Sequence, residues 1–324
     1  MKTFEDLRHL VETEFQNLSL PKSPSNFYSP VKYVLSQGGK RMRPVFTLLA
    51  CNIFSDDVEK ALKPALGMEI FHNFTLLHDD IMDHSDMRRG KPTVNVKWCD
   101  NIAILAGDGM AFIASKYVAQ APEAVRSQVC DIFYQTAIEV CEGQQYDMDF
   151  ENSNSVKEDD YIEMIRLKTA VLPAACLKIG ALIGGASLDD ANHLYNLGIN
   201  VGLAFQLQDD LLDVYSSPEV LGKPIGGDIV ENKKTFMLIK TLEMLDSIQQ
   251  KDLLKYMANK DLVRHEKIAY VTDIYSRLKI AEICQKKIDF YFDEAKKELS
   301  ALNVDSSRLE IIKSFVEKIS TRKK

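Results

Sequence analysis

The chain has 324 residues and a formal net charge of −7. This length allows a large hydrophobic core in one or two domains, and the negative charge excludes the basic surface that is typical of nucleic-acid-binding proteins. With 15 glycines and 10 prolines, both breakers together are below average usage, which favours long helices over many short strands.

The six cysteines are scattered and form no CxxC pair, as is typical of reduced, mostly buried thiols in a cytosolic protein. The first fifteen residues are amphipathic and acidic and lack the apolar run of a signal peptide. The longest nearly apolar segment, residues 169–186, is interrupted by Pro173 and Lys178, so we predict no membrane-spanning helix. We therefore expect a cytoplasmic protein that has no integral membrane segment and binds no nucleic acid.

Apolar residues recur at helical spacing along nearly the whole chain. One helix is predicted over residues 4–18, a second begins at residue 31, and a third begins at Pro44, because proline suits the first turn of a helix. Further helices are predicted over residues 61–83, 124–142, 159–185, 194–215, 234–245, 251–259 and 276–302. The alternating segment 93–98 is too short to make a sheet. We predict a single all-α domain over residues 1–324 with about ten or more helices.

One long irregular segment, residues 216–235, interrupts this pattern. It contains three glycines, two prolines and three lysines. Loops of this length in a compact domain are usually functional or disordered. We expect this loop to act as a lid, with Gly222, Gly226 and Gly227 giving it freedom.

An acidic cluster closes the helix predicted over residues 61–83. Asp79 and Asp83 lie four residues apart and share a face, while Asp80 points about 100° away. Carboxylates at this spacing destabilise a helix by about a few tenths of a kcal/mol, and the helix dipole disfavours them further near a C-terminus. One interpretation is a solvated acidic face. The other is a divalent cation bridged by both carboxylates, because Mg²⁺ binds through one or two carboxylates, waters and phosphate oxygens.

The helix predicted over residues 194–215 ends in the same pattern, with Asp209, Asp210 and Asp213, and Gln206 lies about one turn earlier. Two DDxxD clusters, each closing a long apolar helix, are hard to attribute to chance. If the two helices face each other in a bundle, the clusters would form two walls of one site that holds several Mg²⁺ ions and a polyphosphate.

Cations accompany the acidic clusters and the helix breaks. Arginine suits bidentate phosphate binding, and lysine supplies a compact charge. In an acidic protein, this placement predicts two anion sites, one bridged by metal and one made of side chains only. The cations are Lys40, Arg41 and Arg43 in GGKRMRP (38–44), Arg88 and Arg89, Lys168 next to Thr169, and Lys223, Lys233 and Lys234 on or beside the loop.

These motifs resemble those of the trans-isoprenyl diphosphate synthases, or polyprenyl synthetases. The matching segments are GGKRMRP, LLHDDIMDHSDMRRGKPTVN, KTA, FQLQDDLLD and GKPIGGDIVENKKT, which occur in the family's order between residues 38 and 235. The resemblance implies an all-α bundle around a deep central cavity, usually as a homodimer. It also implies Mg²⁺-dependent, head-to-tail condensation of isopentenyl diphosphate with an allylic diphosphate of C5 to C15.

The resemblance also implies roles for individual residues. The metal ligands would be Asp79, Asp83 and Asp209, for about three Mg²⁺ ions, supported by Asp80, Asp210 and Asp213. The allylic diphosphate would be held by Arg88, Lys168, Lys223 and Lys233, and isopentenyl diphosphate by Gly39, Lys40, Arg43, His72 and Arg89. Thr169, Gln206 and the Lys168 carbonyl would face the carbocation that forms when the allylic C–O bond ionises. A satisfied core histidine is the other interpretation of His72.

Phe74 and Thr75, five and four residues before Asp79, are expected to limit product length. At 1.5 Å rise per residue, Phe74 lies about 7 Å below the metal site, and Phe71 and Ile70 lie one turn deeper. In the family, one aromatic residue at the first of these positions and a small residue at the second are typical of a C20 product. The sequence therefore favours geranylgeranyl diphosphate, with C15 farnesyl diphosphate as the alternative. Phe74 could also be a plain core residue.

Two remoter alternatives use parts of the same pattern. A class I terpene cyclase also has a DDxxD helix and uses Mg²⁺, but its second metal motif normally contains Asn, Ser or Glu, and it would not need the GGKRMRP anion site. A non-catalytic regulatory subunit commonly loses one acidic cluster, whereas this chain keeps both.

Overall fold

The computed structural model describes the chain except residues 152, 154, 217–224, 260 and 322–324. The chain divides into two compact units. Unit 1 comprises Met1–Ala137, Leu172–Tyr195 and Ala301–Ile312, and unit 2 comprises Ile138–Val171, Asn196–Ser300 and Lys313–Lys324. Several helices contribute residues to both units. The expectation of one domain over residues 1–324 stays a prediction.

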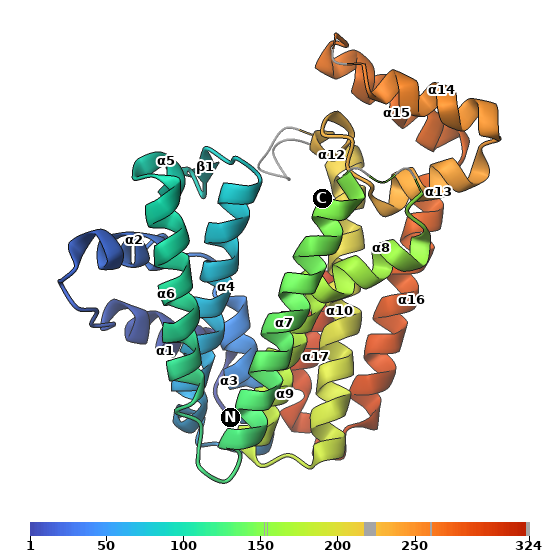
Figure 1. Ribbon diagram of the computed structural model, residues 1–324. Helices are drawn as coiled ribbons and strands as arrows, with labels where there is room; N and C mark the ends of the chain where they lie inside the picture. The colour runs from blue at the N-terminus through green and yellow to red at the C-terminus, as the bar shows by residue number, and fades with distance from the viewer. Residues whose placement is uncertain (152, 154, 217–224, 260, 322–324) are drawn as a thin grey trace. The chain divides into compact units, whose positions relative to one another are not determined.

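The first half of the chain is helical apart from a small hairpin (Figure 1). The hairpin pairs β1 (Met87–Arg88) with β2 (Lys91–Pro92) in antiparallel fashion, and it is the only sheet among the residues that the structure describes. The helices are α1 (Phe4–Gln16), α2 (Ser25–Leu35), α3 (Met42–Phe54), the 3₁₀ turn η1 (Glu59–Ala61), α4 (Leu62–Met82), α5 (Val94–Lys97), α6 (Asp100–Val118) and α7 (Arg126–Glu151).

The second half contains further helices and one π-helical turn. They are α8 (Glu158–Ile165), the π turn η2 (Arg166–Ala170), α9 (Val171–Gly184), α10 (Leu188–Tyr215), α12 (Gly227–Val230), α13 (Phe236–Met244), α14 (Ser247–Met257), α15 (Arg264–Arg277), α16 (Ile280–Ala301), the 3₁₀ turn η3 (Ser306–Arg308) and α17 (Glu310–Ser320). The prediction of an all-α fold is confirmed.

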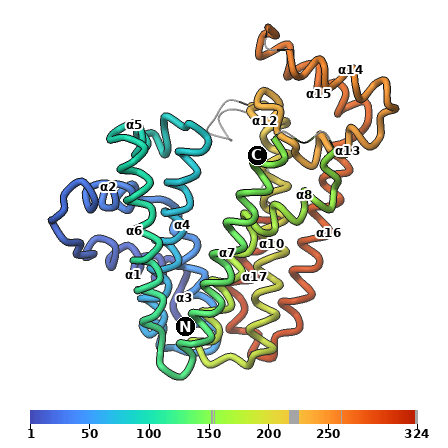
Figure 2. The backbone as a smooth tube through the Cα atoms, in the orientation of Figure 1, coloured from blue at the N-terminus to red at the C-terminus, as the bar shows by residue number. Residues whose placement is uncertain are grey.

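In unit 1, α4 and α6 run side by side (Figures 1 and 2). Small residues let the two backbones approach. A Cβ added at Gly67 on α4 would lie 2.7 Å from a methyl group of Val118, and one at Gly107 on α6 would lie 2.3 Å from Nε2 of His78. The close contact positions the C-terminal end of α4, which carries the first acidic cluster.

In unit 2, α8 is tied to α13 and α16 by ion pairs, and α10 contacts α16. The Glu158 carboxylate pairs with Lys240 and, at 2.7 Å, with Lys287. Cys284 on α16 donates its S–H to the Leu207 carbonyl on α10. These contacts position the C-terminal end of α10, which carries the second acidic cluster.

Several boundaries differ from the predicted ones. The helix expected to end at Glu142 continues to Glu151, the segment 276–302 is interrupted between α15 and α16, the alternating segment 93–98 contains α5, and α12 lies inside the loop 216–235. α6 and α17 were not predicted at all, and only the last two residues of α15 fall within a predicted helix. The stretch Glu158–Gly184 is long and apolar enough to cross a membrane, but 78% of its most apolar window is buried, as in the core helix of a globular protein.

All six cysteines are free. Cys51, Cys176 and Cys284 are buried, Cys130 is half-buried, and Cys99 and Cys141 are exposed. Burial raises the pKa of the Cys51 and Cys176 thiols to about 12, so these two stay protonated at neutral pH.

Candidate active site

The β1–β2 hairpin brings an arginine to the first acidic cluster at the end of α4. Arg88 Nε donates to Asp80 Oδ1 at 2.7 Å, and Arg88 Nη2 lies 3.3 Å from Asp79 Oδ2. Asp80 is buried, and burial raises its pKa, although the Arg88 guanidinium opposes the shift. The Arg88 guanidinium therefore offsets the repulsion between the Asp79 and Asp80 carboxylates.

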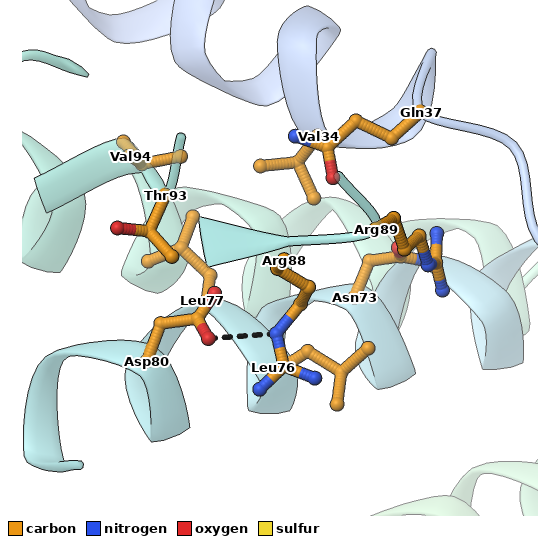
Figure 3. A pocket seen from close by; sticks show the side chains of 10 residues that line it. All are labelled: Val34, Gln37, Asn73, Leu76, Leu77, Asp80, Arg88, Arg89, Thr93 and Val94. Carbon is orange, nitrogen blue, oxygen red and sulfur yellow. Dashed lines mark hydrogen bonds and ion pairs between the residues drawn. The ribbon is translucent and has the colours of Figure 1, made fainter. Parts of the chain in front are cut away.

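A small cavity of about 10 Å³ lies beside this pair, between α2, α4 and the hairpin. Figure 3 shows Arg88 turned toward Asp80, whereas Arg89 turns away from Asp80, beside Asn73. The cavity has room for about one water molecule. The two neighbouring arginines thus point to different groups, as two separate anion sites would require.

Arg43, His72, Arg89 and Gly39 gather at the start of α3. Burial, followed by the positive charges of Arg43 and Arg89, lowers the pKa of His72 well below its usual value. Arg89 Nη1 donates to the Gly38 carbonyl, and a Cβ at Gly39, whose φ is +133°, would lie 3.1 Å from the Arg89 guanidinium carbon. Glycine at 39 thus leaves room for Arg89.

Arg43 contributes an unsatisfied group to this cluster. Its Nε is buried and has no hydrogen-bond partner among the residues that the structure describes. A buried unpaired donor costs free energy, and an anion that accepts this hydrogen bond would remove the cost. Lys40, the remaining cation predicted for this anion site, is exposed.

Arg41, which the sequence grouped with these cations, has a structural role instead. It is 3% exposed, and its Nη1 donates to Glu69 Oε1 at 3.0 Å while its Nη2 donates to the Leu35 carbonyl at 2.8 Å. Its guanidinium also lies 4.4 Å from the centre of the Phe15 ring. Arg41 has a left-handed backbone (φ +51°) directly before α3, so its side chain is directed into the core while Lys40 stays exposed.

In unit 2, the second acidic cluster at the end of α10 is embedded in a chain of hydrogen bonds. Thr169 Oγ1 donates to Gln206 Oε1 at 3.3 Å, and Gln206 Nε2 donates to Asp210 Oδ1 at 3.2 Å. The Tyr161 hydroxyl donates to Asp210 Oδ2. Burial raises the pKa of Asp210 to about 7, and the negative charge of Asp228 adds to the rise. Sequence reasoning missed Tyr161, which lies 49 residues from its partner.

The same unit holds the remaining support of the cluster. Asp213 is buried, and its Oδ2 accepts the backbone N–H of Asp228 at 3.0 Å. Asp228 also lies near Lys233, whose Nζ is 3.9 Å from Asp228 Oδ1 and 3.2 Å from Glu231 Oε2. Burial lowers the pKa of Lys233, but these carboxylates outweigh burial and raise it to about 12. Lys233 therefore stays charged. Lys223 and Gly222 lie outside the residues that the structure describes.

Lys168 and Thr169 lie in the π-helical turn η2. Such turns occur mostly as single turns within α-helices, often at functional sites, and they interrupt the regular hydrogen-bond ladder. The Lys168 ammonium pairs with Asp147 on α7. The two helices touch because α7 has a glycine at 143, where a Cβ would lie 2.2 Å from the Lys168 nitrogen. Asp147 is a second residue that sequence reasoning missed.

The residues expected to limit product length lie on α4 in unit 1. Ile70 and Phe71 are buried, and Phe74 and Thr75 are half-buried. The Thr75 hydroxyl donates to the His72 carbonyl at 2.8 Å, so its polar group is satisfied within the helix. The Phe74 ring packs against the rings of Phe71 and His78. The central cavity that these residues would close stays a prediction.

Comparison with known proteins agrees with these features. The polyprenyl synthetase family model matches residues 24–275. A geranylgeranyl diphosphate synthase of Methanosarcina mazei is 45% identical over 222 residues, 68% of each chain. A geranylfarnesyl diphosphate synthase of Natronomonas pharaonis is 38% identical over 251 residues, 72% of this chain and 74% of that one. A crystal structure of geranylgeranyl pyrophosphate synthase covers 100% of both chains with a TM-score of 0.94 and 37% identity. The chain therefore belongs to the polyprenyl synthetase family, and it is a prenyltransferase.

Proposed function

We propose that this chain is a geranylgeranyl diphosphate synthase. It would condense isopentenyl diphosphate head to tail with C5, C10 and C15 allylic diphosphates and release an all-trans C20 product. The observation that carries the proposal is the cluster of Arg43, His72 and Arg89 beside a separate acidic cluster that has its own arginine, Arg88. A reaction between two diphosphates needs two anion sites, whereas a terpene cyclase acts on one.

The family is Mg²⁺-dependent, and the donor set fits this ion. Asp79, Asp83 and Asp209 offer carboxylate oxygens, which Mg²⁺ prefers, together with waters and phosphate oxygens. We propose these three as ligands for about three ions, with Asp80, Asp210 and Asp213 as their supports. When bound, Mg²⁺ would neutralise charge on the departing diphosphate.

The chain's own cations complete the binding of both substrates. Arg88, Lys168, Lys223 and Lys233 would hold the allylic diphosphate, and Lys40, Arg43 and Arg89 would hold isopentenyl diphosphate against the backbone at Gly39. The lowered pKa of His72 keeps its ring neutral. A neutral imidazole can still donate one N–H to a phosphate oxygen, and it adds no further charge to the crowded arginines.

Ionisation of the allylic C–O bond leaves a carbocation, which the double bond of isopentenyl diphosphate attacks. Oxygen dipoles of Thr169 and Gln206 would face this cation, as would the Lys168 carbonyl in the π turn. Their hydrogen-bonded chain to Asp210 fixes their orientation in advance, so no reorganisation is needed during the reaction. The departing diphosphate would take the proton that is lost in the last step.

We also propose a homodimer. α6 exposes Ile104, Leu105 and Phe112, the last with 77% of its area accessible, and α7 exposes Tyr134, whose hydroxyl hydrogen-bonds Ser115 on α6. Several exposed apolar side chains on one element are typical of interaction surfaces. Replacing Phe112 by lysine should convert a dimer into a monomer in light scattering after size exclusion, whereas Phe290→Lys, at an exposed site on α16, should not.

The reaction itself is tested with purified protein, Mg²⁺, labelled isopentenyl diphosphate and each of the C5, C10 and C15 primers. The products are dephosphorylated and sized by chromatography. Termination at C20 is expected. Termination at C15 or C25 would refute the product assignment but retain the reaction class. A folded protein that elongates no primer would refute the synthase assignment, and hydrocarbon formed from an allylic diphosphate alone would indicate a cyclase.

A further inference from the structure

A row of aromatic rings follows one face of α4. The centres of the Phe71 and Phe74 rings are 5.4 Å apart, those of Phe74 and His78 are 4.8 Å apart, and Phe71 also packs edge to face against Phe133 on α7 at 5.3 Å. The row follows from spacing, because residues three and four apart are neighbours on a helix surface. The half-buried Phe74 ring is thus held between two other rings.

His78 is fixed in turn by α6. Its Nε2 lies 3.2 Å from the Ile104 carbonyl oxygen and 3.9 Å from Asp108 Oδ1. The ring occupies the notch left by Gly107, since a Cβ there would lie 2.3 Å from Nε2 and 2.5 Å from Cδ2. Only glycine at 107 leaves room for the imidazole in this place.

The helical geometry makes the direction of Phe74 depend on these neighbours. At about 100° per residue, Thr75 lies about 40° around the helix from Asp79, whereas Phe74 lies about 140° away. Phe74 is therefore not aligned with the carboxylates above it. The Phe74 ring can contact a prenyl chain that extends from Asp79 only in a rotamer directed around the helix toward the Asp79 face. The rings packed against Phe74 determine which rotamer it adopts.

We propose that His78 is a positioning residue for product length, which holds the Phe74 ring in the place where it stops the growing chain. This inference rests on the proposed function and deepens it, because it assigns a specificity role to the residue before Asp79. Without the His78 ring, Phe74 turns to another rotamer and the chain extends by at least one further isoprene unit.

One test compares two substitutions of His78. His78→Ala removes the ring, and His78→Phe keeps a ring but loses the hydrogen bond to Ile104. We expect His78→Ala to raise the ratio of C25 to C20 product about fivefold, which corresponds to a change of about 1 kcal/mol in relative barriers. His78→Phe should keep the parent ratio. Slower condensation from disturbance of Asp79 would favour release of the C20 product and lower this ratio, so a raised ratio cannot come from a loss of rate.

A second test leaves α4 untouched. Gly107→Ala displaces the imidazole from its notch and should lengthen the product as His78→Ala does. Gly109→Ala is the matched control, because it lies on the same helix and its Cβ would meet a different ring, with Phe27 Cζ at 2.1 Å. Both substitutions crowd an aromatic ring, but only the first crowds His78.

The outcomes are distinguishable. Longer products from His78→Ala and Gly107→Ala, with parent length from His78→Phe and Gly109→Ala, would support the assignment. A parent that stops at C20 with unchanged product length in His78→Ala would overturn it, even if the variant is slower. If Gly107→Ala does not fold, the His78 pair decides alone. A parent that elongates no primer would instead refute the proposed function.

Discussion

Replacing Glu69 by alanine should destabilise the protein strongly, because Glu69 and Arg41 form a buried ion pair. Glu69 is 2% exposed and Arg41 is 3% exposed, and the pair is 3.0 Å long. The substitution leaves a buried guanidinium without its main counter-charge. It also removes the carboxylate oxygen that accepts a hydrogen bond from Asn73 at 3.3 Å.

Breaking a buried pair by removing one partner typically costs about 3–5 kcal/mol. Unfolding entropy of about 2.1 cal/mol/K per residue gives about 0.7 kcal/mol/K for 324 residues. The expected decrease in Tm is therefore about 4–7 °C. The contacts of Arg41 with the Leu35 carbonyl and the Phe15 ring survive the substitution, so the lower part of this range is expected.

The measurement is scanning calorimetry at neutral pH, with Glu5→Ala as the control. Glu5 also pairs with an arginine, Arg8, at 3.0 Å, but the two side chains are 70% and 51% exposed. An exposed pair contributes about 1 kcal/mol or less, so the control should lose less than about 1.5 °C. If Glu69→Ala loses no more than the control, the reasoning about burial is wrong.

Four further predictions follow from the site. Arg43→Met should raise KM for isopentenyl diphosphate about 10–150-fold with little change in kcat, since a hydrogen bond to a charged group is worth about 1.5–3 kcal/mol. Steady-state kinetics that show a lower kcat with an unchanged KM would contradict the binding role. Asp79→Asn should lower kcat at least about 100-fold and raise the Mg²⁺ concentration for half-maximal activity, and chelation of Mg²⁺ should abolish parent activity reversibly. Burial and the nearby arginines hold the pKa of His72 well below 6.5 in the folded protein. As the pH drops through 6.5, His72 therefore takes up a proton in the unfolded chain but not in the folded one, and the free energy of unfolding should decrease. Tm measured against pH should fall less in His72→Asn than in the parent. Tyr161→Phe removes the O–H that Asp210 accepts and should lower Tm by about 2–4 °C; an unchanged Tm would show that this contact contributes nothing.

Most helices with large apolar stripes were predicted, whereas α6, which is built on small residues, was not. α17 was also missed, although it buries Ile312 and Val316. α6 buries mainly alanine and glycine, among them Ala103, Ala106 and Gly107, and such a face becomes apolar surface only when α4 packs on it. For the same reason Gly143 looked like a helix end, although it is a point of close approach to Lys168. The break before α16 occurs at Lys279, whose φ is +55° without any glycine or proline to mark it.

In the candidate site, the sequence predicted the residues that lie close together along the chain, but not the contacts between residues far apart in the sequence. The aspartate clusters were found because their members lie within about one helical turn, and Arg88 was found because it lies only eight residues after Asp80. The contacts of Tyr161 with Asp210 and of Lys168 with Asp147 join residues 49 and 21 positions apart, and no local sequence pattern predicts them. Arg41 and Arg43 lie two residues apart in one motif, but Arg41 has a left-handed backbone before α3 and Arg43 lies within α3; the residue types alone do not show this difference.

The distribution of the cysteines also has a practical use. Cys99 belongs to unit 1 and Cys141 to unit 2, and both are exposed, whereas Cys51, Cys176 and Cys284 are buried. With the half-buried Cys130 replaced by serine, the chain carries one native attachment point for a spin or fluorescent label on each unit. A distance distribution between the two labels, recorded before and after addition of Mg²⁺ and diphosphate, would show whether their binding changes the spacing of the units, without any engineered thiol.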